Sequence, residues 1–240
     1  MTPRLFSLND APFAGRTGRG VIVAVVDSGV RAPHPHVPRV RGGVDLTSRS
    51  EGTDFSDRLG HGTAVSAAIL EKAPDAELLA VKVFGSALAT SAETLARAII
   101  WSARNGARLV NLSLGTSNPQ HSELLGAAVA EANALGALVV SAQELDGKSW
   151  LPGSLSDVAG VQVDWQCDRD AVVLVAEPSS HDVIFRASGF PRPIPGVPRE
   201  RNLSGISFAV ANVTGFLARL LESAPDIRSL ENVKQHLSVR

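Results

Sequence analysis

The sequence predicts an α/β fold in which a mostly parallel sheet is flanked by helices on both faces. Apolar segments of strand length alternate with segments of helical spacing, and this βαβ alternation requires parallel strands joined by crossover helices. Residues 21–26 are all apolar, which is typical of a strand that is covered on both faces. With 240 residues, 44% hydrophobic and 20% charged, the chain is expected to form a single domain spanning 1–240.

Seven segments have the apolar content and length of strands. We expect strands at 21–26, 40–46, 77–84, 108–114, 137–142, 158–164 and 171–176. Residues 1–20 contain arginine, proline and glycine without an apolar run, so an irregular N-terminal arm is expected there. The Pro- and Arg-rich residues 188–201 predict a loop for the same reason.

Four segments place apolar residues at helical spacing. We expect helices at 63–72, 91–105, 122–135 and from 207 to about 221. Ser91 is a good N-cap for the second helix, and Gly106 and Gly136 stand just past the ends of the second and third. Pro74 ends the first helix.

Composition excludes several classes of function. A net charge of -1 argues against a nucleic-acid partner, and no apolar run approaches the roughly 20 residues that cross a membrane. Cys167 is the single cysteine, so no internal disulfide forms and nothing indicates an oxidising compartment. The first 20 residues lack the apolar core of a signal peptide, and we expect a soluble cytoplasmic protein without membrane contact.

Three polar residues stand at the ends of expected elements. Asp27 follows the buried strand 21–26, at the edge where parallel sheets place their ligands. His61 lies in Gly60-His61-Gly62-Thr63, which opens a helix. Ser207 precedes an apolar helical segment and is expected to be its N-cap or its first residue, where unpaired N–H groups and the helix dipole favour an oxyanion. A serine hydroxyl becomes a nucleophile when a neighbouring base takes its proton.

Five short motifs resemble signatures of the subtilase family, and they occur in the family's order. They are Val-Ala-Val-Val-Asp-Ser-Gly (23–29), Gly-His-Gly-Thr (60–63), Ala-Val-Lys-Val (80–83), Asn-Leu-Ser-Leu-Gly (111–115) and Gly-Ile-Ser-Phe-Ala (205–209). The order Asp, His, Ser is also that of subtilisin. The resemblance covers roughly residues 15 to 225 and implies a subtilisin-like three-layer sandwich.

The resemblance also implies a serine endopeptidase that needs no cofactor. Ser207 would be the nucleophile, His61 the general base and then acid, and Asp27 the group that orients the imidazole. Ser113, Leu114 and Gly115 would form the edge that pairs with a peptide or protein substrate bound as an extended strand.

The chain departs from the family pattern at the oxyanion hole. Aligned without a gap from Gly136, Leu145 falls where the family has an asparagine that donates a hydrogen bond to the oxyanion. Leucine has no donor, and losing this donor in subtilisin costs about 10²–10³ in rate. Gln143 is the nearest amide that could replace it.

Two further departures concern the specificity pocket and metals. Trp150 falls where a small residue usually lines the pocket floor, so the indole either fills the pocket or turns into the core. The chain has no room between Lys72 and Glu77 for the family's calcium loop, and we expect no metal site. His34 and His36 lack a third ligand nearby in sequence and suit a loop-structural role.

Two functions remain open. One is a serine endopeptidase with a restricted substrate, such as a precursor peptide whose leader it removes. The other is a pseudo-subtilase that binds a peptide or partner without cleaving it. The complete triad favours the enzyme, whereas Leu145 favours the binding module.

Overall fold

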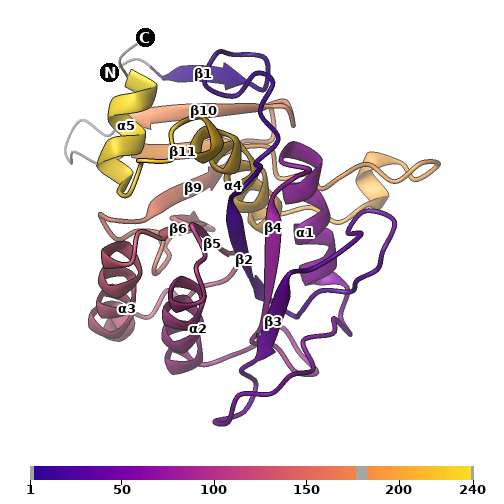
Figure 1. Ribbon diagram of the computed structural model, residues 1–240, viewed down its shortest axis with the longest axis vertical. Coiled ribbons are helices and arrows are strands. Elements are labelled where there is room, and N and C mark those ends of the chain that lie inside the picture. The colour runs from indigo at the N-terminus through magenta and orange to yellow at the C-terminus, as the bar shows by residue number, and fades with distance from the viewer. Residues whose placement is uncertain (1–2, 177–182, 239–240) are drawn as a thin grey trace.

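A nine-stranded sheet forms the centre of the protein, in the strand order β1-β10-β11-β9-β6-β5-β2-β4-β3 (Figure 1). The computed structural model describes residues 3–176 and 183–238. The strands are β1 (Arg4–Ser7), β2 (Ile22–Asp27), β3 (Gly42–Asp45), β4 (Glu77–Lys82), β5 (Leu109–Leu112), β6 (Leu138–Ala142), β9 (Ala159–Val163), β10 (Ala171–Ala176) and β11 (Val183–Ala187). Neighbours from β11 to β3 pair in parallel, and β10 and β1 add antiparallel pairs at one edge. The predicted fold class is confirmed.

The helices cover both faces of this sheet (Figure 1). They are α1 (His61–Lys72), α2 (Ala92–Arg104), α3 (Ser122–Ala134), α4 (Ile206–Ser223) and α5 (Leu230–Ser238). Apolar residues of α1 and α4 share one buried cluster with Val23 and Val25, whereas those of α2 and α3 share another with Ala24 and Val26. Successive residues of β2 therefore face opposite layers, which explains its unbroken apolar run. None of the described helices has both the length and the apolar character that crossing a bilayer requires.

The predicted helix and strand positions agree with the structure in the central sheet and differ at its margins. Ser91 caps α2 as expected, because its side chain accepts a hydrogen bond from Thr94 N at 3.2 Å. The expected irregular arm is wrong at Arg4–Ser7, where β1 pairs with β10. Ser207 is neither the N-cap nor the first residue of α4, because these are Gly205 and Ile206. β1 is a four-residue edge strand. A segment without a clear alternation of apolar and polar residues can still form a strand when it pairs with the exposed edge of a sheet, as β1 does with β10.

The polar residues of interest collect where the parallel strands end. β2 ends at Asp27 and β5 ends just before Ser113. The helices that begin nearby, α1 and α4, start at His61 and Ile206. A buried side-chain bond ties α4 to β5, because Thr214 Oγ1 donates to Asn111 Oδ1 at 2.9 Å.

The crossing of α1 and α4 fixes the distance between His61 and Ser207. Gly215 of α4 faces α1 so closely that a Cβ there would lie 2.5 Å from Cβ of Lys72 and 3.1 Å from the carbonyl oxygen of Ile69. Gly215 therefore permits a close approach of the two helices, and an alanine at this position would force them apart. Because His61 and Ser207 lie on these two helices, the crossing also sets the geometry of the site.

We predict opposite effects for two glycine-to-alanine substitutions inside helices. Gly215→Ala should lower the free energy of unfolding by about 1–3 kcal/mol, because the methyl group overpacks the crossing. Gly126→Ala in α3 is the control, since a Cβ there meets nothing within 4 Å, and it should add about 0.5–1 kcal/mol. Urea denaturation measures both, and a stabilising Gly215→Ala would contradict the close crossing.

Candidate active site

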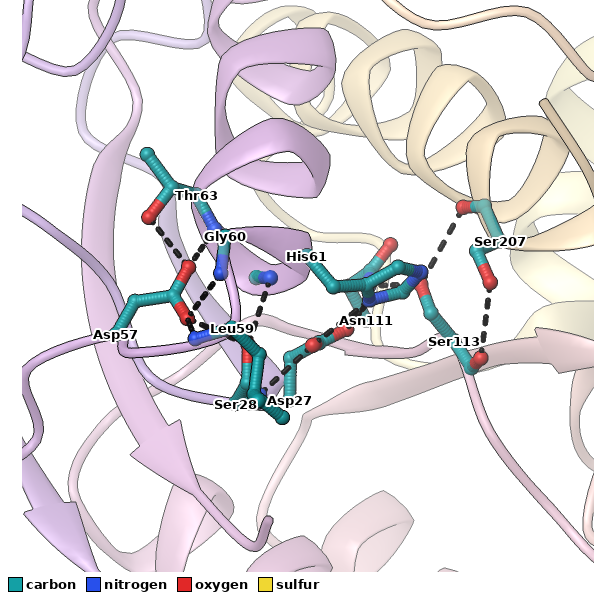
Figure 2. A network of polar contacts seen from close by, with 11 residues as sticks. Asp27, Ser28, Asp57, Leu59, Gly60, His61, Thr63, Asn111, Ser113 and Ser207 are labelled. Atoms are coloured by element: carbon teal, nitrogen blue, oxygen red, sulfur yellow. Dashed lines mark hydrogen bonds and ion pairs between the residues drawn. The ribbon is translucent and has the colours of Figure 1, made fainter. Parts of the chain in front are cut away.

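The carboxylate of Asp27 is fully buried at the end of β2 and is bonded to His61 (Figure 2). Nδ1 of His61 lies 2.8 Å from Oδ1 and 2.9 Å from Oδ2 of Asp27, and Ser28 N donates to Oδ1 at 2.7 Å. A carboxylate accepts the proton of Nδ1, so the lone pair of the neutral ring resides on Nε2. The pairing therefore prepares Nε2 to accept a proton.

Gly62 allows the first turn of α1 to reach the end of β2. A Cβ at Gly62 would lie 3.1 Å from Cβ of Asp27 and would collide with the carbonyl oxygen of Gly29. His61 is the first residue of α1, and the N-cap Gly60 has a left-handed φ of 86°. Glycine on both sides of His61 thus lets the imidazole sit beside a buried carboxylate.

A second carboxylate, Asp57, holds the segment in front of His61. Its oxygens accept five hydrogen bonds of 2.6–2.9 Å, from Ser28 Oγ, Leu59 N, Gly60 N, and the N–H and hydroxyl of Thr63. Ser28 Oγ in turn accepts from Gly62 N at 3.0 Å. Burial by itself would raise the pKa of Asp57, but hydrogen bonds from Thr63, Gly60 and Ser28 hold this pKa below its usual value.

Asp57 was not among the residues that we singled out from the sequence. It stands three residues before the N-cap of α1, outside the helix that it caps. An aspartate followed by glycine at that spacing is a weak signal for a turn that bonds its own backbone, and it could have been found that way.

The pKa of His61 lies above its usual 6.5. Burial opposes this rise, but the hydrogen bond and charge of Asp27 outweigh burial, and the charge of Asp57 adds to them. An imidazolium at this position is therefore stabilised by two carboxylates.

Ser207 is tied to the end of β5. Its Oγ donates to the carbonyl oxygen of Ser113 at 3.2 Å, and Ser113 Oγ donates to the carbonyl oxygen of Ser207 at 3.3 Å. Asn111 Nδ2, a further residue that the sequence reasoning did not single out, donates to Ser113 Oγ at 2.9 Å. Figure 2 shows the imidazole of His61 between Asp27 and Ser207. Asp27 and His61 are thus paired, whereas the hydroxyl of Ser207 is bonded to Ser113, and no hydrogen bond among the described residues joins it to His61.

Gln143 and Leu145 lie at a hairpin rather than in an open loop. Glu144–Leu145 (β7) pairs with Lys148–Ser149 (β8), and the turn residues Asp146 and Gly147 have φ of 52° and 73°, as in a type I′ turn. Gln143 Oε1 accepts from Gln162 Nε2 at 2.8 Å. The side chain of Gln143 is therefore hydrogen-bonded to β9, and Leu145 is part of β7.

The indole of Trp150 lies directly on Gly115. A Cβ at Gly115 would be 2.6 Å from both Cδ1 and Nε1 of Trp150. Thr116 and Leu151 bind the two segments together, with Thr116 N donating to Leu151 O at 2.9 Å and Leu151 N to Thr116 O at 2.8 Å. The indole therefore lies beside the predicted substrate edge, and Trp150 also packs against the buried core, so both alternatives for it hold in part.

The raised pKa of His61 predicts a particular dependence on Asp57. Asp57→Asn removes one stabilising charge and should lower the pKa of His61, measured by NMR titration of the ring. Asp54→Asn is the control, because Asp54 is exposed and pairs with Arg58. An unchanged or higher pKa in Asp57→Asn would contradict the assignment.

The raised pKa of His61 also determines how the stability of the fold depends on pH. Because the folded pKa exceeds 6.5, protonated His61 stabilises the native state fully below the unfolded pKa, and this contribution disappears as pH rises through the folded pKa.

Known proteins are similar to this chain in sequence. A model described as the subtilase family matches residues 18–144. Subtilisin Savinase from Lederbergia lenta is 31% identical over 93% of this chain and 84% of its own length. An alkaline protease from Alkalihalobacillus alcalophilus is also 31% identical over 93% of this chain, which spans 59% of that relative's length.

Solved structures show the same fold. The solved structure of Sphericase is similar to this chain with a TM-score of 0.69 at 23% identity, and the match covers 89% of this chain and 80% of Sphericase. A cold-adapted subtilisin-like serine proteinase gives a TM-score of 0.69 at 22% identity, covering 88% and 78%. By the family match, the identity to Savinase and this fold, the chain belongs to the subtilase family.

Proposed function

We propose that the chain is a serine endopeptidase that uses Asp27, His61 and Ser207 as its triad. The observation that carries the proposal is the paired Asp27 carboxylate and His61 ring, with Ser207 at the first turn of α4 on the ring's other side. Family membership supports it, as do the relatives named as proteases.

The geometry suggests how the reaction would proceed. Ser207 Oγ leaves the carbonyl of Ser113 by rotation about its Cα–Cβ bond and gives its proton to Nε2 of His61 as it attacks the substrate carbonyl. The imidazolium is stabilised by Asp27 and Asp57, and it then gives the proton to the leaving amine. The developing oxyanion is stabilised by the N–H of Ser207, since the first N–H groups of α4 have no acceptor within the helix.

We further propose that the substrate is a restricted peptide, such as a precursor or its leader, and that cleavage takes place in the cytoplasm. The peptide would lie as an extended strand along Ser113, Leu114 and Gly115. Trp150 supports the restriction, because its indole occupies the space beside Gly115 and favours a small residue before the scissile bond. Leu145 supports slow turnover, because its side chain offers no second donor to the oxyanion.

The alternative is a pseudo-subtilase that binds a peptide or partner. The hydrogen bond from Ser207 Oγ to Ser113 O favours it, together with Leu145. In this alternative, the edge at Ser113–Gly115 would still bind an extended chain.

The proposed function predicts that a fluorophosphonate probe labels Ser207 slowly and does not label Ser207→Ala. Leu145→Asn should raise the hydrolysis rate of an activated ester about 10- to 100-fold, a fraction of the roughly 10²–10³ that an ideally placed donor contributes. We expect an incomplete gain, because Glu144 stands next to position 145 in sequence and adds a negative charge to the segment that would meet the oxyanion.

Gln143→Ala separates the two candidate donors. If Gln143 already serves the oxyanion, this variant loses activity and Leu145→Asn changes nothing. A protein that is never labelled, with rates unchanged by both substitutions, contradicts the enzyme and supports the pseudo-subtilase.

Trp150 is predicted to set the preference for the residue before the scissile bond. In Trp150→Ala, the ratio of kcat/KM for a phenylalanine peptide to that for an alanine peptide should rise at least about tenfold, since a pocket discriminates by roughly 1–3 kcal/mol per small group. The ratio is measured within one variant, so it does not depend on the folded fraction. Trp101→Ala, a half-buried tryptophan on α2, should leave the ratio unchanged, and an unchanged ratio in Trp150→Ala would refute the blocked pocket.

A further inference from the structure

A large groove opens beside the first turn of α1. Its volume is about 830 Å³, and three stretches of chain line it: part of 31–36, residues 57–67 around the start of α1, and part of 191–203. The last stretch precedes α4 and lies beside α1 in Figure 1. Gly60 and Thr63, on either side of His61 in the sequence, line the groove, so it adjoins the segment that carries His61.

The groove adjoins the start of α1, which carries the residue that would protonate the leaving group. The predicted substrate edge, Ser113–Gly115, lies at the end of β5 and contacts Ser207. In the proposed mechanism His61 protonates the leaving amine, so the chain beyond the scissile bond passes His61 and moves away from that edge. The groove next to Gly60 and Thr63 is the space that it enters.

The charge of the groove is strongly one-sided. Its lining includes four arginines and one carboxylate, Asp57, although the whole chain has a net charge of -1. The oxygens of Asp57 already accept five hydrogen bonds, and Arg58 is paired with Asp54 at 2.9 Å.

Three of these guanidinium groups have no carboxylate partner within the described ranges. They belong to Arg31, Arg192 and Arg201. Arg31 and Arg201 are exposed, and Arg192 is half-buried. The positive charge of the groove is therefore available to a ligand.

A histidine inside the groove responds to this charge. The pKa of His36 is lowered first by burial and then by the charges of Arg192 and His34, against the charge of Glu71, which raises it. His36 is therefore mostly neutral at pH 7, and the arginines supply the positive charge. The exposed side chains of Ile194 and Leu203 provide apolar contact beside them.

We infer that this groove selects substrates with carboxylates in the first few residues after the scissile bond, through Arg31, Arg192 and Arg201. The inference rests on the proposed function for the direction in which the substrate runs. Guanidinium groups bind carboxylates through paired hydrogen bonds. The carboxylates can be aspartate and glutamate side chains or the free C-terminus of a short leaving segment, and the chemistry of recognition is the same.

Three synthetic peptides test the inference, each with Ala-Ala-Ala-Gly before the intended bond. The first continues with Asp-Glu-Asp and an amidated end, the second with Asn-Gln-Asn and an amidated end, and the third with Asn-Gln-Asn and a free carboxylate. Binding to Ser207→Ala is measured by fluorescence anisotropy, and kcat/KM is measured with the unmodified protein. The binding measurement does not depend on catalysis.

The acidic peptide should bind about tenfold more tightly than the neutral one at low salt, and the ratio should fall towards one near 0.5 M salt, where the Debye length is a few ångströms. Adding Arg31→Gln and Arg201→Gln together should remove most of this preference. Arg104→Gln is the matched control, because Arg104 pairs with Glu131 on the α2–α3 side, and it should leave the ratio intact. If the third peptide alone binds tightly, the groove recognises a free C-terminus.

Failure of the groove and failure of the proposed function give different results. Equal binding of all three peptides overturns the inference, even if the fluorophosphonate probe labels Ser207. A charge preference that survives the double arginine substitution also overturns it. A preference that the substitution removes, in a protein that the probe never labels, supports the groove and overturns the enzyme.

Discussion

The hydrogen-bonded pair of Asp27 and His61 is the contact on which the rest of the site depends. A fully buried carboxylate is costly unless it is paired, and Asp27 has its partners in His61 and the N–H of Ser28. To supply the imidazole, α1 must begin against the end of β2, which requires Gly62. Asp57 then satisfies the N–H groups that this approach exposes. One buried charge thus accounts for the conformation of the chain around the start of α1.

Ser207 reaches the same place by a different route. It is carried by α4, which is fixed to α1 at Gly215 and to β5 through Thr214 and Asn111. Asn111 also contacts Ser113, which exchanges hydrogen bonds with Ser207. His61 and Ser207 are therefore placed by the buried core, whereas the arginine groove lies at the surface.

The central sheet and the triad candidates could be predicted because their signals are local. The apolar run before Asp27 and the glycines around His61 lie within a few residues of the positions that they identify. Asp57 leaves only a weak local signal, because it bonds residues up to Thr63 just after it. Asn111 could not be assigned from local sequence, because its partner Thr214 lies 103 residues away on α4. β1 was missed because it forms by pairing with β10 rather than from an apolar pattern of its own. The start of α4 was misplaced because serine is such a common helix N-cap. The sequence also left two orientations open for Trp150, and in the structure it contacts both Gly115 and the buried core.

The crossing at Gly215 has a consequence for how such a protein can diversify. Because the reacting side chains are spaced by two packed helices, the hairpin at 144–149 and the loop at 191–203 can change in length or composition without altering that spacing. Core packing is intolerant of small changes in volume, whereas surface loops accept insertions at low cost. Sequence variation can therefore accumulate in these two surface segments while the packing of the helix pair stays nearly unchanged. A rigid chemical unit with replaceable surroundings is a ready starting point for new specificities, whether they arise by natural drift or by grafting loops in the laboratory.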